Sequence, residues 1–333
     1  MTNRSSQNGM IALYALLLVA ALAAPMFLYP QFVMRAYCFA LFAVAFNLLL
    51  GYVGLLSFGH AAFFGLAAYV TGHAAKIWGV GPELAILLGA LAAAALGVLF
   101  GGLAIRRQGI YFAMVTLALA QMLYFIFLQA PFTHGEDGIQ GIPRGHLFGV
   151  FDLNDSLTMY YFVLAVFILG FLVIQRTVHS PFGQILKAIR ENEPRAISLG
   201  YNTDRYKLQA FVISATLSGV AGGLFALTFQ IASLNNAHWH LSGEVVLMTL
   251  LGGLGTVLGP VVGAFMVAAI QQYLAAYGAW VSIFQGIIFV ACVLLFRRGI
   301  VGEIIALATP RGKAGAETAD AHGETPKPAR QGV

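Results

Sequence analysis

Long apolar runs recur along almost the whole chain, and each is close to the length that an α-helix needs to cross a membrane. A helix needs about 20 apolar residues to span hydrocarbon. Hydrophobic residues make up 59% of the 333 residues and charged residues only 9%, whereas soluble domains are about 25% charged. We therefore predict an all-α polytopic membrane protein with eight full spans. These spans are expected at 10–30, 33–52, 55–75, 84–105, 110–130, 157–175, 208–234 and 279–296.

A further apolar region, 244–274, is interrupted by a glycine-rich run that ends in a proline, 252–260. Glycine and proline disfavour a continuous helix here. At ~1.5 Å per residue, the region is too short for two full perpendicular spans. We expect a broken helical hairpin, which gives eight to ten segments in all. Both a re-entrant hairpin and two short tilted spans fit the pattern.

The distribution of basic residues predicts the orientation in the membrane. Lys and Arg gather in the loop 176–207 and again at Arg297 and Arg298, whereas the loop 131–156 has one basic residue, Arg144, among four acidic ones. Because short cytoplasmic loops carry an excess of Lys and Arg, 176–207 and both termini should be cytoplasmic. The loop 131–156 should lie outside.

Three parts follow from this orientation. Residues 1–9 form a cytoplasmic N-terminus, and 10–298 form the membrane domain with its cytoplasmic loop 176–207. Residues 299–333 are rich in Pro, Gly, Ala, Lys and Glu without periodicity, which predicts a largely disordered cytoplasmic tail. The net charge of +5 lies at the edges of apolar runs, so it indicates topology and not nucleic-acid binding.

The predicted spans are expected to contain essentially no charged side chains, with Glu83 and Glu244 at helix starts. Ion-coupled transporters usually carry such side chains within their spans. The sequence also has no phosphate-binding loop and no hydrolase motif, and His238 and His240 are a weak metal signal. We expect no catalytic residue, no metal and no cofactor in this chain, so any driving energy should come from another protein.

The loop 176–207 is expected to form two short amphipathic helices. Ser180 before a proline is a good helix N-cap, and Gly200 suits the position just after a helix end. A solvated basic connector is the alternative. The apolar stripe favours a helix pair that docks into the groove of a partner protein. Its residues are Ile185, Ile189, Ile197 and Leu199.

Three segments resemble the branched-chain amino acid permease family of ABC importers, particularly its LivM-type subunit. The stretch 51–65, Gly-Tyr-Val-Gly-Leu-Leu-Ser-Phe-Gly-His-Ala-Ala-Phe-Phe-Gly, is similar to the family signature. The glycine-rich run 250–260 and the stretch from Arg190 to Phe211 are also similar to that family. Within the last stretch, 193–200 resembles the coupling loop of ABC permeases, with Arg195 in place of an alanine.

The resemblance implies a permease domain, without enzyme activity, that moves branched-chain amino acids or related small polar solutes by alternating access. It implies the bacterial inner membrane, a second homologous permease, two ATP-binding subunits that use ATP and Mg, and a periplasmic or lipid-anchored solute-binding protein. The alternative is a permease or ATP-independent channel for urea or short amides. Residues expected to couple to the ATPases are Arg190, Glu191, Glu193, Ala196 and Gly200.

Candidate residues of a translocation pathway come from the two glycine-rich segments, because polar groups and broken helix ends suit small zwitterions. They are Ser57, His60, Gly252, Gly253, Gly255 and Gly259. Packing is the competing interpretation for His60 and for each glycine. The Gly-x-x-x-Gly motifs that begin at Gly97 and Gly219 are expected to be helix-packing faces.

Overall fold

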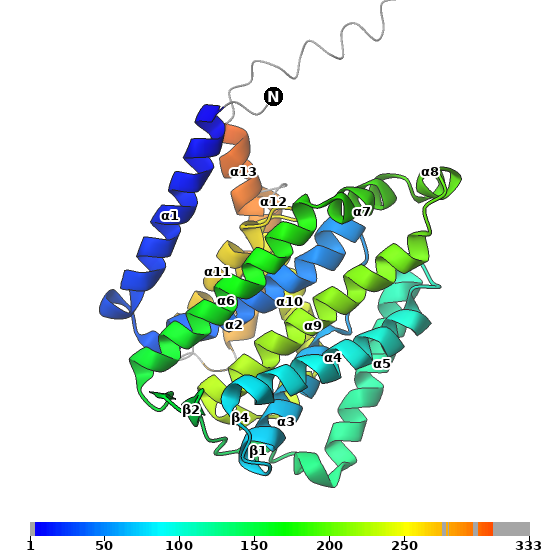
Figure 1. Cartoon of the computed structure of the whole chain (residues 1–333). Helices are drawn as coiled ribbons and strands as arrows, with labels where there is room; N and C mark the ends of the chain where they lie inside the picture. The colour runs from blue at the N-terminus through cyan, green and yellow to red at the C-terminus, as the bar shows by residue number, and fades with distance from the viewer. Residues whose placement is uncertain (1–3, 275–277, 279, 296–298, 309–333) are drawn as a thin grey trace, which may run out of the picture.

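The computed structural model describes residues 4–274, 278, 280–295 and 299–308, which form a bundle of helices (Figure 1). Within these residues, five helices are long and apolar enough to cross a membrane, as judged by length and composition. This confirms a helical, multi-pass membrane protein, while eight full spans and cytoplasmic termini stay predictions. The five are Pro30–Val53 (α2 with the π-helical turn η1 that follows it), Pro82–Ala104 (α4), Ile110–Gln129 (α5), Ser156–His179 (α6) and Thr203–Phe229 (α9).

Helices α1 and α12 cover the first and last predicted spans. α1 runs over Arg4–Phe27, so it begins inside the segment 1–9, and α12 runs over Trp280–Leu295. A short helix, α13 (Gly299–Ala308), occupies the first part of the predicted tail. The remainder of that tail, 309–333, lies outside the described residues.

The predicted span 55–75 is not one continuous helix. The turn η1 (Leu48–Val53) ends at Gly54, whose φ of 83° is left-handed, and α3 starts only at His60 and runs to Lys76. Glycine reaches such a φ without a Cβ clash. The segment 54–59 is therefore non-helical backbone, exposed at Gly54 and buried at Ser57 and Gly59. At membrane depth, such backbone is permitted only where protein or a water-filled cavity surrounds it.

The predicted broken hairpin is present as two helices, α10 (Trp239–Gly252) and α11 (Gly259–Leu274). Gly253 and Gly255 between them have φ values of 117° and 74°, which glycine adopts readily. The two helices touch backbone to backbone, because a Cβ on Gly252 would lie 1.8 Å from the carbonyl oxygen of Gly259. Glycine thus both breaks the helix and lets its halves meet.

Helices α3, α4 and α9 pack against one another through small side chains. A Cβ on Gly97 would lie 2.8 Å from the Cβ of Ala215, and one on Gly219 would lie 2.4 Å from the Cβ of Ala93. Glycine at such positions lets helix backbones approach closely. The packing role predicted for the two Gly-x-x-x-Gly motifs is confirmed.

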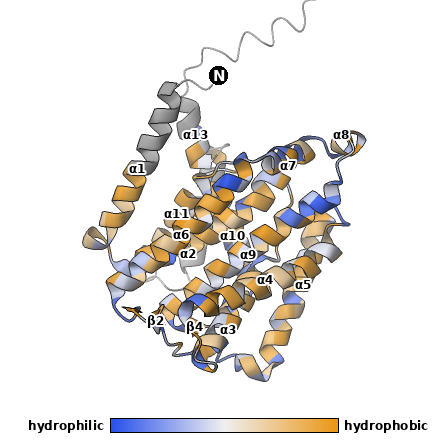
Figure 2. Cartoon of the chain, in the orientation of Figure 1, coloured by the Kyte–Doolittle hydropathy of each residue, from blue (hydrophilic) through white to orange (hydrophobic). Residues whose placement is uncertain are grey.

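One end of the bundle, which we call the α7 end, carries two short helices, α7 (Pro181–Glu191) and α8 (Glu193–Ser198), beside η1 and the start of α9. Hydrophilic residues gather around this end, whereas the helix bodies are mostly hydrophobic (Figure 2). The short-helix prediction for 176–207 is confirmed.

The opposite end, which we call the strand end, carries short strands that the sequence did not predict. β1 pairs antiparallel with β4, and β2 pairs antiparallel with β3. Helix α9 therefore ends at Phe229, before the predicted limit of 234, because Gln230 turns left-handed and the chain continues into β4. The bounds are Ile139–Gln140 (β1), His146–Leu147 (β2), Phe151–Asp152 (β3) and Ile231–Ala232 (β4), with 3-10 turns at Pro131–Thr133 (η2) and Leu234–Ala237 (η3).

Candidate functional site

Local sequence shapes the helix pair α7 and α8. The Ser180 hydroxyl accepts a hydrogen bond from the Gly183 N–H at 3.4 Å, with proline at the first helical position, as the sequence predicted. The Asn192 side chain caps α8 by accepting from the Arg195 N–H at 3.0 Å. Gly200 follows α8 with a left-handed φ of 89°. Only Asn192 lies between the end of α7 and the start of α8, so α7 and α8 are two separate helices.

The apolar residues of the two helices face different ways. Ile189 and Leu186 of α7 are buried against the bundle, with exposed fractions of 3% and 0%. Ile197 and Leu199, on and just after α8, are 55% and 69% exposed. The prediction of one apolar stripe for a partner was therefore wrong for Ile189, because α7 uses its apolar face to attach itself to the membrane domain.

Helix α7 rests on the π-helical turn η1. The Arg190 Nη1 donates a hydrogen bond to the Gly51 carbonyl oxygen, and the Lys187 Nζ lies 5.6 Å from the ring centroid of Tyr52. A Cβ on Gly54 would lie 3.1 Å from the Cγ of Arg190. Gly51 and Gly54, the first glycines of the stretch 51–65, therefore belong to the surface on which α7 packs. π-helical turns occur often at functional sites.

The same turn is tied to the break in the hairpin by a buried amide. Asn47 is 1% exposed. Its Nδ2 donates to the Thr256 carbonyl oxygen at 2.8 Å, and its Oδ1 accepts from the Gly255 N–H at 3.2 Å. Gly51 must be small here, because a Cβ on it would lie 2.8 Å from the Gly255 nitrogen. Three segments that are distant in sequence thus meet at one joint.

Glu193, the acidic residue of the coupling-like motif, is held from two sides. Lys207 at the start of α9 donates to its Oε1, and the Nε2 of Gln108 lies 3.2 Å from its Oε2. Ala196 is 3% exposed, so α8 packs down on its alanine. Glu191 is exposed. Of the five residues predicted to couple to ATPases, Arg190, Glu193 and Ala196 make contacts inside the chain.

The predicted pathway residues Ser57 and His60 are fully buried. Ser57 accepts from the Gly59 N–H at 3.2 Å, and the His60 Nε2 lies 2.9 Å from the Ser214 hydroxyl, which donates to the Ala45 carbonyl oxygen at 2.6 Å. This contact satisfies one ring nitrogen of His60, whereas its buried Nδ1 has no hydrogen-bond partner among the described residues. Its role in a pathway stays a prediction.

The hairpin glycines were also predicted to line the pathway. Gly252, Gly253, Gly255 and Gly259 lie at the α7 end, where Gly255 contacts η1 and Gly252 and Gly253 contact the start of α13. A Cβ on Gly299, for example, would lie 2.3 Å from the Gly253 Cα. Whether solute passes this break stays a prediction.

Two polar residues in α2 were missed by sequence reasoning. Asn47 joins the hairpin, and Arg35 lies inside a span that we expected to be free of charge. The Arg35 Nη2 donates to the Gln271 Oε1 at 3.1 Å, and its Cζ lies 5.6 Å from the Phe39 ring centroid. Each is a polar residue in an apolar run of the sequence. Inside a membrane, a polar residue in such a position indicates a functional site.

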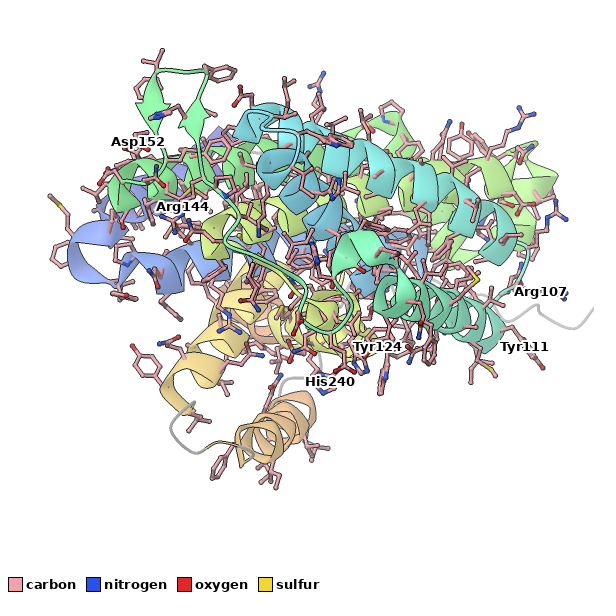
Figure 3. The ribbon with its side chains drawn as sticks, turned by 90° about the horizontal axis from the view of Figure 1, so that it is seen from below. Arg107, Tyr111, Tyr124, Arg144, Asp152 and His240 are labelled. Atoms are coloured by element: carbon pink, nitrogen blue, oxygen red, sulfur yellow. The ribbon has the colours of Figure 1, made fainter. Side chains whose placement is uncertain are left out.

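Polar contacts hold the loops at the strand end. The Arg144 Nη2 donates to the Thr228 carbonyl oxygen at 2.7 Å, and burial lowers the pKa of this arginine. Asp155 caps α6 by accepting from the Thr158 N–H at 3.0 Å, which lowers the pKa of its carboxyl. The Asn154 N–H donates a hydrogen bond to the Asp152 Oδ1, which lowers the pKa of the Asp152 carboxyl. Arg144 and Asp152 lie at the opposite side of the molecule from Arg107 (Figure 3).

No group of three His, Cys, Asp or Glu side chains that could hold a metal ion occurs among the described residues. His240, one of the two histidines noted in the sequence, has its Nδ1 3.7 Å from the Glu244 Oε1. Cys38 is buried in α2 as a free thiol.

A family model described as "Branched-chain amino acid transport system / permease component" matches residues 28–293. The chain belongs to this family. The match begins just before α2 and ends within α12, so it includes the joint at the α7 end. The resemblance inferred from the glycine signature and the coupling motif is thereby confirmed.

Curated relatives carry permease names, in agreement with a transport component and not an enzyme. The permease protein LivM of Escherichia coli (strain K12) is 29% identical over 263 residues, which are 72% of this chain and 62% of that protein. BraD of Pseudomonas aeruginosa, a branched-chain amino acid permease protein, is 24% identical over 80% of this chain and 92% of its own. The autoinducer 2 permease protein LsrC of Klebsiella pneumoniae is 28% identical over 62% and 60%.

The chain thus spans about three fifths of the length of the E. coli relative. No solved structure matches it significantly. The comparisons therefore give the family and the class of transport component, and the arrangement of the helices comes from the structure.

Proposed function

We propose that the chain is the membrane-spanning permease subunit of an ABC importer for branched-chain amino acids, working by alternating access driven by partner ATPases. Family membership supports the class. The observation that carries the mechanism is the joint formed by Arg190, Gly51, Asn47 and the hairpin break, because it connects α7, the helix next to the exposed α8, to the membrane helices.

In this mechanism the ATPase docks on α8 and moves α7. Ile197 and Leu199 supply exposed apolar surface for the ATPase groove. Arg190 transmits the displacement to η1, and Asn47 transmits it to the loop between α10 and α11. A coupling claim requires a contiguous physical connection between the two sites. The hydrogen-bonded joint supplies one.

The proposed orientation puts the α7 end in the cytoplasm of a bacterium, across the inner membrane. Lys187, Arg190, Arg195, Arg205 and Lys207 all lie at this end, in keeping with the excess of basic residues in cytoplasmic loops. The strand end then faces outward, where a periplasmic or lipid-anchored solute-binding protein delivers solute. Both chain termini are proposed to be cytoplasmic.

The proposed assembly holds a second homologous permease, two ATP-binding subunits that use ATP and Mg, and surrounding membrane lipids. Relatives named LivM and LivH, which are both branched-chain amino acid permease proteins, support two kinds of permease. A second candidate function is import of another small polar solute, since relatives named for autoinducer 2 import are also similar. The channel for urea or short amides remains the passive alternative.

The test is ATP-dependent uptake of radiolabelled leucine by vesicles that contain this chain and its partner subunits. Changing Ile197 and Leu199 to Asp should abolish ATPase co-purification and uptake, because a charge in a buried apolar interface is costly. Gln184→Ala, on the exposed side of α7, should leave both unchanged. Leucine or urea flux that needs no ATP, and that survives the Ile197 and Leu199 changes, would establish the channel instead.

A further inference from the structure

Two residues of opposite charge lie on the neighbouring helices α2 and α10, toward the strand end. Arg35 lies in the second turn of α2 and Glu244 in the second turn of α10, while Gln271 lies near the end of α11. Tyr37, two residues after Arg35, has its hydroxyl 3.4 Å from that of Tyr160 at the start of α6, which places this layer near the strand end. Charged residues inside a membrane bundle are costly, so they mark functional sites.

On one edge of the Arg35 guanidinium, one of the two nitrogens has a hydrogen-bond partner and the other has none among the described residues. Its Nη2 donates to the Gln271 Oε1 at 3.1 Å, whereas the buried Nε on the same edge has no hydrogen-bond partner among the described residues. That edge is the one that binds a carboxylate through two parallel hydrogen bonds. A single amide oxygen therefore pairs with only one of the two donors on this edge. The Phe39 ring holds the guanidinium in place from its face.

Glu244 supplies the opposite charge at this site. Its side chain is 16% exposed, and its Oε1 lies 3.7 Å from the Nδ1 of the exposed His240. The helices of Glu244 and Arg35 pack against each other, yet no ion pair within 4.0 Å joins the two residues in the described part of the chain. Separated, incompletely paired charges in an apolar surrounding are unfavourable, and a ligand that carries both complementary charges would remove the cost.

We propose that Arg35 and Glu244 bind a free α-amino acid, Arg35 holding its carboxylate and Glu244 its ammonium group. The ligand carboxylate displaces the Gln271 amide oxygen from the Arg35 Nη2. This proposal rests on the proposed importer function and specifies its substrate class as a zwitterion. A neutral solute would leave both charges as they are. With the α7 end in the cytoplasm, the site lies in the outer half of the bundle, where solute enters.

The experiment measures binding of tritiated L-leucine to the purified full-length chain with its partner permease and ATPases in nanodiscs, without a solute-binding protein. Leucine should bind and should raise the melting temperature of the complex. Leucinamide lacks the carboxylate and 4-methylpentanoate lacks the ammonium, so each should compete at least about tenfold more weakly. Equal competition by either analogue would overturn the assignment of the two charges.

Variants separate ligand binding from a structural role. Arg35→Gln and Glu244→Gln should each weaken leucine binding at least about tenfold. Gln271→Leu should preserve or strengthen it, because it frees a donor of Arg35 without removing the charge. Arg144→Gln is the matched control: like Arg35, Arg144 has one hydrogen bond from its Nη2, here to a backbone carbonyl, and a buried Nε without a partner among the described residues, where it forms no ion pair. It should bind leucine normally.

Two outcomes overturn the proposal. If Arg35→Gln binds leucine as wild type does, the site is wrong. If Arg35→Gln and Gln271→Leu both lose binding and both melt at lower temperature without ligand, the cluster is structural. The importer function fails by a different result, loss of ATP-dependent uptake of every solute tested. An importer that carries a neutral solute and never binds leucine would refute the zwitterion site alone.

Discussion

The two ends of the bundle use their polar groups in opposite ways. At the α7 end, the Asn47 amide has partners for both its donor and its acceptor, and Arg190 bonds a backbone carbonyl. Toward the strand end, Arg35 has a buried nitrogen without a partner among the described residues, and Glu244 forms no ion pair with it there. Asn47 is buried, Arg190 is exposed, and Arg35 and Glu244 are partly buried, so the difference in hydrogen bonding does not follow the degree of burial.

Satisfied and unsatisfied polar groups have different physical consequences. Complete hydrogen bonds make a joint rigid, which suits the transmission of a displacement. Incomplete ones cost free energy that a ligand can recover by supplying the missing partners. The contrast therefore assigns transmission to the α7 end and ligand binding to the opposite half. The following changes test it, in order of expected effect.

The largest effect is expected from a methyl group placed in the joint of the hairpin. Gly252→Ala should lower the free energy of unfolding by about 3 kcal/mol or more, because the added Cβ meets the backbone of Gly259. Gly243→Ala in the same helix has nothing within 4 Å of its Cβ and should gain up to about 1 kcal/mol. Melting of the solubilised protein compares them. Equal melting temperatures would show that the joint is loose.

Removing the buried amide should uncouple the two ends. Asn47→Leu leaves the Gly255 N–H and the Thr256 carbonyl without partners, at a cost of about 1–3 kcal/mol. Leucine uptake should fall at least about tenfold while the ATPases still co-purify. Arg176→Gln, an exposed arginine of α6, is the control and should transport normally. Normal uptake by the Asn47 variant would show that the Asn47 hydrogen bonds at the α7 end do not transmit the movement of the ATPases.

The Glu193 pair tests whether α8 is fixed by charge. Lys207 is 4% exposed and Glu193 20%, so Glu193→Gln should leave a buried cation and cost about 1–3 kcal/mol. Adding Lys207→Met should recover most of that loss, because no charge is then left unpaired. The free energies of unfolding of the two single variants and the double variant form a cycle. A purely additive cycle would mean that the pair does not hold α8.

The smallest effect concerns the cap of α7. Ser180→Ala removes the acceptor of the Gly183 N–H and should cost about 1 kcal/mol. Ser180→Asp keeps an acceptor and should preserve stability. Hydrogen exchange of the α7 amides reports the difference, which should be confined to the first turn. Faster exchange across all of α7 in the alanine variant would show that the cap, and not Arg190, holds the helix.

The sequence predicted features whose cause is local. Ser180 and Gly200 limit α7 and α8 through capping and left-handed glycine geometry, and the glycine run breaks the hairpin. The apolar runs predict spans through length alone. These signals act over a few residues or one helix, so they can be read without knowing what packs against what.

Other features depend on contacts between segments far apart in the chain. Ile189 has the same character as Ile197, yet it is buried, because only the tertiary structure puts η1 beneath α7. The helix start at His60 rather than at residue 55 depends on Thr116, whose hydroxyl accepts from the Phe58 N–H at 3.2 Å. A pattern within one segment holds no information about such partners.

By itself, the sequence determined a helical membrane protein of the permease family, since apolar length and glycine motifs are properties of the chain. Only the tertiary structure decided what its few polar residues do. It brought Arg190, Gly51 and Asn47 to the hairpin break in one joint, and it left Arg35 and Glu244 on neighbouring helices without an ion pair between them in the described part of the chain. The physical reason is that the cost of a buried polar group depends on its partners, and the fold supplies those partners.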